Sequence, residues 1–222
     1  MAVITISREF GSEGDYIAEQ VAQTLGYHYV DKEFIGAVLS QYGLVEFDRE
    51  YETLPGFWEK LSAQRGKHRD LIVDMLNQVV RAVAHHGDVV ILGRSGFAIL
   101  AGLADVLHVR LQAPFSQRVE RLMAQQKITL EQAEAVVKER DKVRIAFVEE
   151  YYKVPWEAVH AFDLVINTGK ISPDQATAWV VDAAKALPLS PVADKPTTSS
   201  ITVDPVLVAA ISDSLGCRIA HR

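Results

Sequence analysis

The sequence predicts an α/β fold with a doubly wound parallel sheet, in which helices cover both faces. The first observation is an alternation over residues 1–187. Short apolar runs suited to buried parallel strands are separated by segments with apolar residues at three- and four-residue spacing. The second is a glycine-rich turn between the first apolar run and the first helical segment. Backbone N–H groups of such a turn, together with a helix N-terminus, can bind an anion.

The first strand, turn and helix follow one another directly at the N-terminus. Residues 2–6 (AVITI) predict the strand, and residues 16–25 carry apolar side chains at helical spacing. If Gly11 is matched to the middle glycine of the usual phosphate-binding pattern, Gly14 stands where its lysine belongs and Tyr16 where its magnesium-binding hydroxyl belongs. The alternative is a glycine-rich turn that binds nothing. The candidate phosphate-binding residues are Gly11, Ser12, Glu13, Gly14, Asp15 and Tyr16.

Four further segments predict the remaining strands. Three are apolar runs, VVIL, VLHVRL and FDLVIN, and one is a brief extended piece that ends at Asp31. Their ranges are 28–31, 89–92, 106–111 and 162–167. Because ligands of parallel α/β sheets bind beyond the carboxyl ends of the strands, we expect Arg8, Gly11, Asp31, Arg94 and the 113–118 turn to meet at one edge.

Helices are predicted between these strands. Thr129 and Ser172 each stand three residues before a glutamine, which is a capping pattern, and Pro173 suits the first turn of a helix. Residues 43–56 are polar and end in Pro-Gly, which predicts a connection without regular structure. The predicted helices span residues 16–25, 32–41, about 57–85, 115–123, 129–152 and 173–187.

The C-terminal segment differs in composition from the rest. Residues 188–200 are rich in proline, serine and threonine, which predicts a linker. In the tail that follows, 201–222, Asp204 caps and Pro205 begins a short apolar helix that we expect to end at Gly216. Such a short helix needs a packing partner. It returns to its own domain, crosses to a second subunit of a homodimer, or begins a region beyond this chain.

The composition is that of an ordinary globular protein. Of the 222 residues, 49% are hydrophobic and 23% are charged, which is enough for one substantial domain. The net charge of −6 argues against non-specific binding to nucleic acid. The single cysteine, Cys217, cannot form an intrachain disulfide, and no apolar run is long enough for a membrane span. We therefore expect a cytoplasmic protein without a nucleic-acid or membrane partner.

Several stretches, taken together and in order, resemble the cytidylate kinase-like family, relatives of bacterial CMP kinase among the P-loop nucleoside monophosphate kinases. They are ITISREFGSEG, LGYHYVDKEFI, VVILGRSGFAIL, RLQAPFSQRVERL, EQAEAVVKERDKVR and FDLVINT, and the resemblance covers residues 1–187. The characteristic opening of the family, S-R-E-[FY]-G-S, itself lacks the usual lysine. In the relatives two glycines and a basic residue usually follow, whereas here Glu13 replaces one glycine and Asp15 the basic residue.

The resemblance implies a P-loop nucleoside-kinase-like fold and a reaction. The kinase-like domain would comprise residues 1–187, with an acceptor-binding helical segment at 32–86 and a helical lid at 114–152. The chain would bind nucleotides and transfer the γ-phosphoryl group of ATP, with Mg²⁺, to a nucleoside monophosphate, CMP or dCMP. Phosphoryl transfer depends mainly on positioning and on cations around the phosphates, so the basic residues matter most.

The candidate site residues follow from these comparisons and from position. Arg94 corresponds to a residue at the acceptor phosphate and can grip a phosphate in a bidentate manner. The catalytic candidates are Arg94, Arg140 and Arg144, of which the last two resemble lid arginines. We expect Arg8 and Arg118 at the donor nucleotide, and Asp31 and Arg94 at the acceptor. The candidates for metal binding are Ser12 and Asp31.

Each of these side chains also has an ordinary structural interpretation. Arg8 can pair with Glu9 or Glu13, Asp31 can cap a helix, and the basic stretch KERDKVR can be a surface helix with ion pairs along it. Because Glu13 and Asp15 place negative charge at the anion site, two other functions stay open. One is a nucleotide-binding regulator, a pseudokinase that transfers no phosphate. The other is an assembly protein with a vestigial site.

Overall fold

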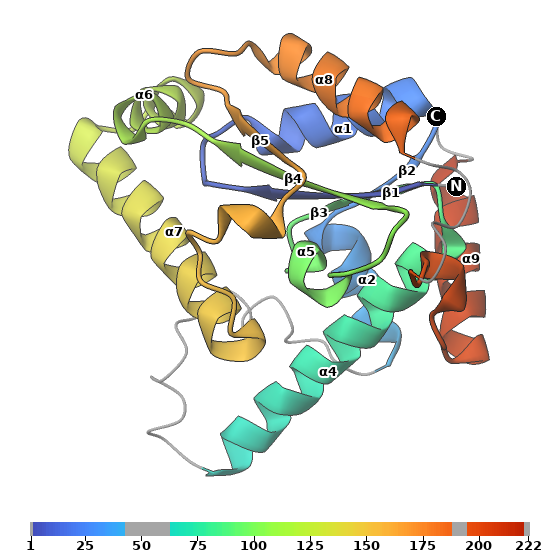
Figure 1. Cartoon of the computed structure of the whole chain (residues 1–222). Coiled ribbons are helices and arrows are strands. Elements are labelled where there is room, and N and C mark those ends of the chain that lie inside the picture. Colours follow the sequence, from blue (N-terminus) through green and yellow to red (C-terminus); the bar gives the residue numbers. More distant parts are fainter. Residues whose placement is uncertain (1, 43–62, 188–194, 220–222) are drawn as a thin grey trace.

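The computed structural model describes residues 2–42, 63–187 and 195–219, and it confirms the predicted α/β class (Figure 1). Within these residues, five strands form one all-parallel sheet in the order β2-β3-β1-β4-β5. Ile6 of the central strand pairs with Leu92 on one side and Val109 on the other. The strands are β1 (Val3–Arg8), β2 (His28–Val30), β3 (Val89–Leu92), β4 (Val106–Gln112) and β5 (Leu164–Asn167).

The helices form largely where the spacing and the caps predict them. The Thr129 hydroxyl accepts a hydrogen bond from the Gln132 N–H in a capping box, and the Ser172 hydroxyl accepts one from the Gln175 N–H. The predicted connection at 43–56 and the first residues of the predicted long helix lie outside the described residues. In the described residues the helices are α1 (Gly14–Leu25), α2 (Lys32–Gln41), α4 (Ala63–His86), α5 (Gly96–Ile99), α6 (Phe115–Gln126), α7 (Leu130–Tyr152), α8 (Pro173–Ala186) and α9 (Pro205–Ile219), with short 3-10 helices η1 (Val159–Ala161) and η2 (Thr198–Ser200).

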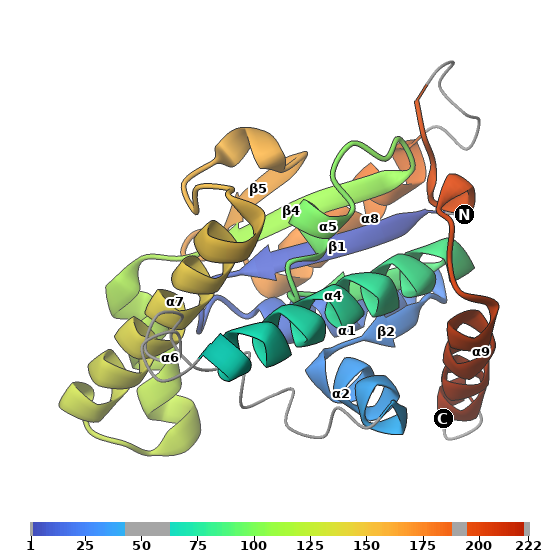
Figure 2. The same cartoon turned by 90° about the horizontal axis from the view of Figure 1, so that it is seen from below.

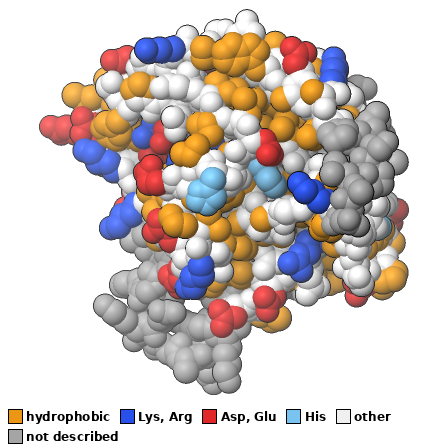
Figure 3. Space-filling view, in the orientation of Figure 1, with side chains coloured by type: hydrophobic (Ala, Val, Ile, Leu, Met, Phe, Trp, Pro, Cys, Tyr) orange, Lys and Arg blue, Asp and Glu red, His pale blue; other side chains and the backbone are white. Residues whose placement is uncertain are grey.

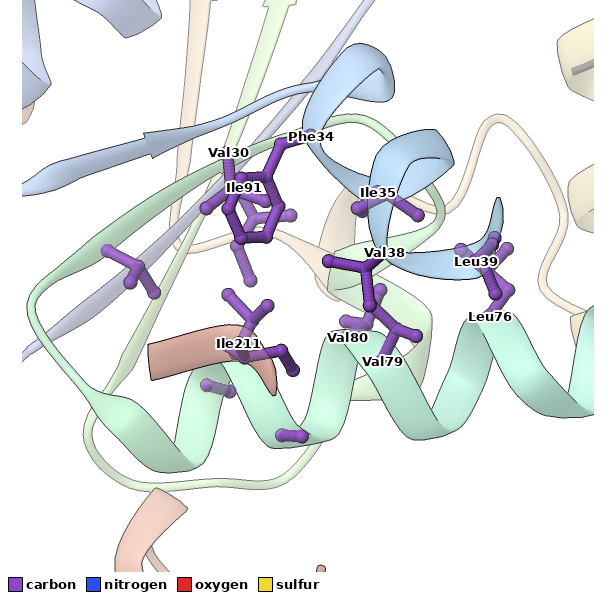
Figure 4. Packing of buried hydrophobic residues seen from close by; sticks show 14 of the residues in the cluster. Val30, Phe34, Ile35, Val38, Leu39, Leu76, Val79, Val80, Ile91 and Ile211 are labelled. Atoms are coloured by element: carbon purple, nitrogen blue, oxygen red, sulfur yellow. The ribbon is translucent and has the colours of Figure 1, made fainter. Parts of the chain in front are cut away.

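Helices cover the two faces of the sheet and meet it through separate apolar clusters. Helices α1 and α8 lie on one face, and α2, α4 and α5 lie on the other (Figures 1 and 2). Ile17 of α1 and Val180 of α8 pack against the first face. On the second face, Phe34 of α2 and Leu76 of α4 pack with Ile91 of β3 (Figure 4). Helices α6 and α7 stand apart, beyond the carboxyl ends of the strands (Figure 2).

The C-terminal tail returns to its own domain, which was one of the three alternatives left open by the sequence. Leu207, Ile211 and Leu215 of α9 are buried in the cluster that contains α2 and α4. The prediction that this helix ends at Gly216 is wrong, because α9 continues to Ile219. Gly216 is not among the described glycines with a positive φ, so it does not form the left-handed cap that ends many helices, and α9 continues through it at a cost of about 1 kcal/mol relative to alanine.

The surface shows no strong segregation of charge in the view of Figure 3, where acidic and basic side chains are interspersed among hydrophobic ones. Among the helices in the described ranges, none combines the length and the apolar character that crossing a membrane requires.

Candidate active site

The loop between β1 and α1 has an unusual backbone. Gly11 has a φ of 82°, and Glu13 adopts the left-handed conformation with a φ of 63° immediately before α1. That conformation costs a residue with a side chain about 1–2 kcal/mol, which explains why glycine suits position 13 better than glutamate. The Ser12 side chain is fully buried, and its hydroxyl donates to the Glu9 carbonyl at 2.9 Å. This bond fixes part of the loop from within, and Arg118 and Arg121 of α6 fix it from outside by donating to the carbonyls of Phe10 and Gly11.

A single pocket at the carboxyl ends of β1 and β3 collects the predicted arginines. Arg8, Arg94, Arg140 and Arg144 all line it, and Lys32 at the start of α2 joins them. We call this the cationic pocket; it encloses about 80 Å³. Lys32 was not among the residues predicted from the sequence, although its place shortly after β2 puts it at the same sheet edge. The remaining lining residues are Thr5, Ser7, Gly93, Ser95, Phe97, Val143, Val148 and Trp156.

Arg94 lies in a sharp turn after β3. Gly93, Arg94 and Ser95 all have positive φ, with values of 71°, 50° and 54°. Non-glycine residues in this conformation are strained, and such strain persists only where the surroundings enforce it, commonly at functional sites. The Arg94 side chain is buried, with the residue 4% exposed, so the turn holds a guanidinium inside the protein at the sheet edge. A charge-assisted hydrogen bond to an anion is strongest in such a place.

Arg8 leaves the end of β1 and runs along the start of α1 toward the turn after β3. Its Nη2 lies 3.4 Å from the Asp15 carboxylate, which is 78% exposed. Its methylene groups pass the backbone of Gly14, and its Nη1 passes the backbone of Gly93. Neither Glu9 nor Glu13 pairs with it among the described residues, so the alternative pairings suggested by the sequence are not those observed.

The lid region, residues 114–152, touches the loop directly. The Phe10 N–H donates to the Asp141 carboxylate of α7 at 3.0 Å. Arg144 donates to the Arg8 carbonyl at 3.4 Å, and its guanidinium lies 5.5 Å from the centre of the Phe10 ring. Helix α7 thus brings Arg140 and Arg144 over the cationic pocket while Asp141 anchors it to the loop.

Two predicted donor-binding residues lie away from the cationic pocket. Arg118 is buried, pairs with Asp141, lies 3.5 Å from the Glu9 carboxylate, and donates to the carbonyl of Phe10 at 3.0 Å. The Tyr16 hydroxyl donates to Asp174 of α8 at 2.9 Å, and this bond raises the pKa of Tyr16. Both side chains are used to join elements of the fold in this arrangement, and their contacts with a nucleotide stay predictions.

The side chains proposed for metal binding do not form a magnesium site by themselves. The Asp31 carboxylate caps α2 by accepting the Phe34 N–H at 2.8 Å, and the Ser12 hydroxyl is bonded to a backbone carbonyl. In the part of the chain that the structure describes, no group of three or more His, Cys, Asp or Glu side chains is arranged to hold a metal ion. Mg²⁺ prefers oxygen ligands and retains water, so its other ligands would have to be phosphate oxygens and water.

An aromatic wall closes one side of the pocket. Trp156 lines the cavity, and the guanidinium of Arg110, a residue of β4, lies 4.3 Å from the centre of the Trp156 ring. Arg110 also donates to the Trp156 carbonyl at 2.7 Å, so the tryptophan is held in place. Burial lowers the pKa of Arg110, although nearby carboxylates, Glu9 among them, oppose this. Trp156 was not among the site residues predicted from the sequence.

A buried histidine stands behind the pocket. The Thr5 hydroxyl lies 2.7 Å from Nδ1 of His108, and Thr5 itself lines the pocket. Burial lowers the pKa of His108, while the Asp163 carboxylate and the Leu100 carbonyl oppose the shift. The neutral imidazole of His108 on β4 therefore links this strand to Thr5 of β1.

Comparisons with known proteins identify the family and the fold of the chain. A family model described as the cytidylate kinase-like family matches residues 3–170. The cytidylate kinase of Natronomonas pharaonis is 30% identical over 184 residues, covering 83% of this chain and 90% of its own, and that of Halobacterium salinarum is 28% identical over the same shares. A crystal structure of an uncharacterized protein from Eubacterium ventriosum is 19% identical, with a TM-score of 0.64 over 84% of this chain and 99% of that one. At this identity the structural likeness supports the fold alone.

Proposed function

Because the chain belongs to the cytidylate kinase-like family, we propose that it transfers the γ-phosphoryl group of ATP to a nucleoside monophosphate, with CMP or dCMP as the acceptor. The observation that carries this proposal is the gathering of five cationic side chains from four parts of the fold in one pocket. In phosphoryl transfer the protein does little covalent chemistry. The rate depends on holding the attacking oxygen, the phosphorus and the leaving oxygen in line, and on balancing the negative charge of the transferring phosphoryl group.

The position of each cation suggests its role. Lys32 and Arg94 lie at the carboxyl ends of β2 and β3, where they would hold the acceptor phosphate. Arg140 and Arg144 lie on α7, where they would stabilise the charge on the transferring group. Arg8 lies beside the loop, where it would meet the donor.

The lid contributes exclusion of water as well as charge. In the described conformation, Asp141 ties α7 to the Phe10 N–H and Arg144 contacts the Arg8 carbonyl, so the lid and the loop are already joined. The cationic pocket is partly open to solvent, and α7 forms part of its wall. We expect α7 to open for binding and to close before transfer, so that water does not compete with the acceptor.

The test is a binding panel followed by a turnover assay. ATP, GTP, CMP and dCMP are titrated separately by calorimetry with Mg²⁺ present, and ADP formation is then followed with each acceptor that binds. We expect one triphosphate and one monophosphate to bind at distinct sites and a nucleoside diphosphate to form. Arg94→Ala should lower turnover by about 100- to 1,000-fold, the usual loss for one charge-stabilising donor.

Arg81→Ala is the matched control, because Arg81 is exposed on α4 toward the end that leads to the amino end of β3. Its turnover should equal that of the unaltered protein. Binding of both ligands without any product would overturn the kinase proposal.

One observation favours a second candidate, a nucleotide-binding regulator without transfer. The Asp15 carboxylate lies beside Arg8, and Glu13 lies 3.6 Å from Arg121, so two negative charges stand at the loop. Both oppose a phosphate group there. A regulator would give saturable binding without product, whereas an assembly protein with a vestigial site would give neither.

A further inference from the structure

We propose that Arg8 takes the place of the missing phosphate-binding lysine, reaching the triphosphate of the donor from β1 instead of from α1. The inference rests on the proposed function, because it assigns a role at the same site. In the pattern G-x-x-x-x-G-K-[ST], the first glycine stands six positions before the lysine. With Gly14 in the place of the lysine, Arg8 stands in the place of that glycine. The cation and the glycine have exchanged positions across the loop.

The packing of Arg8 on Gly14 shows that the exchange is mutual. A Cβ atom added to Gly14 would lie 2.6 Å from Cγ and 2.8 Å from Cβ of Arg8. Non-bonded carbon atoms do not approach so closely, so a side chain at position 14 and the observed Arg8 side chain exclude each other. The stem of Arg8 fills the space in which the stem of a lysine would begin. Gly14 is thus required by the presence of Arg8.

The other end of the arginine rests on a second glycine. A Cβ atom on Gly93 would fall inside the contact distance of Nη1 of Arg8. Gly93 begins the turn that carries Arg94, so the Arg8 side chain spans the distance from the loop to that turn. Its guanidinium is placed between the N-terminus of α1 and Arg94, and both arginines line the cationic pocket. This is where the phosphate groups of a donor and an acceptor would meet.

The hydrogen bonds of Arg8 leave donors for a ligand. Nε is buried and has no hydrogen-bond partner among the described residues. Asp15 pairs with Nη2 only at 3.4 Å and is largely exposed to water, so this ion pair contributes little. A phosphate offers two oxygens to the planar guanidinium and would displace the carboxylate. The exposed Asp15 side chain can rotate away into solvent without leaving a buried charge.

The experiment is an exchange of the two positions, read by the affinity for ATP and, separately, by the affinity for CMP. Arg8→Met keeps the stem that packs on Gly14 and removes the charge, so the fold is retained. It should weaken ATP binding by about 10- to 100-fold, the usual effect of losing a charged hydrogen-bonding group. Gly14→Lys alone should lower the melting temperature through the clash. Arg8→Gly combined with Gly14→Lys restores the first glycine and the lysine of the usual pattern, with Glu13 and Asp15 unchanged, and should recover most of the ATP affinity.

The outcomes separate this inference from the proposed function. If the unaltered protein binds no triphosphate, both fail. If it binds ATP and Arg8→Met binds equally well, or if the double variant binds no better than Arg8→Met, the role of Arg8 is overturned while the kinase proposal stands. The affinity for CMP reports on folding, because neither exchange adds or removes a side chain assigned to the acceptor. Arg81→Ala should leave both affinities unchanged.

Discussion

The burial of α9 gives a prediction whose size can be worked out from the structure. Ile211 is fully buried in the cluster with α2 and α4, and Ile211→Ala removes most of its side chain. At about 0.8 kcal/mol for each lost methylene, the transfer free energy alone is about 2.4 kcal/mol. The cavity left behind raises the cost to about 2–5 kcal/mol. A domain with an unfolding free energy of about 5–15 kcal/mol would stay folded, with a clearly lower denaturation midpoint.

Val206→Ala on the same helix is the matched control. Val206 is 68% exposed, so its truncation loses only about 0.5 kcal/mol of transfer free energy, which the better helix propensity of alanine roughly offsets. Urea denaturation followed by circular dichroism, at two protein concentrations, measures both variants. If Ile211→Ala destabilises the protein no more than Val206→Ala, α9 does not pack as described. A midpoint that rises with protein concentration would mean that the helix packs on a second subunit.

Two further predictions concern stability at the loop and behind the pocket. Glu13→Gly should raise the unfolding free energy by about 0.5–1 kcal/mol, because glycine adopts the left-handed backbone without strain and only a long ion pair to Arg121 is lost. The control, Glu120→Gly on the exposed face of α6, should instead lower the unfolding free energy by about 1 kcal/mol. Equal effects of the two variants in urea denaturation would contradict the backbone argument. His108 is kept neutral by burial, with Asp163 only partly opposing, so the unfolded chain binds a proton below about pH 6.5 that the folded chain does not. Below about pH 6.5 the unfolding free energy should therefore fall by up to about 1.4 kcal/mol per pH unit relative to that of His108→Asn. If the difference in unfolding free energy between the two proteins stays constant with pH, this reasoning is refuted.

The order of strands and helices could be predicted because local chemistry and tertiary packing agree. The segment VVIL, which forms the whole of β3, has no polar side chain, and all four of its residues are buried. The capping patterns at Thr129 and Ser172 satisfy backbone groups within one turn, so no distant partner decides them. The end of α9 was misplaced because a glycine can either take a positive φ and end a helix or stay helical, and Gly216 stays helical.

The site was predictable only in part. The position of a residue at the end of a strand fixes where its Cα lies but does not fix which groups its charged end contacts. Arg8 and Arg94 follow strands, and the sheet brings both to one pocket. Arg118 looked like an equal candidate, but Glu9 and Asp141 approach it from segments far away in the sequence and bind it inside the fold. No local signal distinguishes an arginine that meets a ligand from one that meets a carboxylate of its own chain. Lys32 was missed because it is the first residue of a helix, directly after the cap Asp31, and nothing in the sequence shows that its side chain reaches the pocket.

The return of α9 to the sheet has a consequence for how the protein is made. The apolar cluster that contains Val3 and Val30 is completed by Leu207, Ile211 and Leu215, which come last in the sequence among its buried residues in the described part of the chain. During synthesis the strands in the described residues leave the ribosome before these residues do, so the nascent chain shows an open apolar face until α9 has emerged. Premature termination before α9 would release a protein with a complete sheet and an uncovered core, the kind of species that chaperones and proteases recognise.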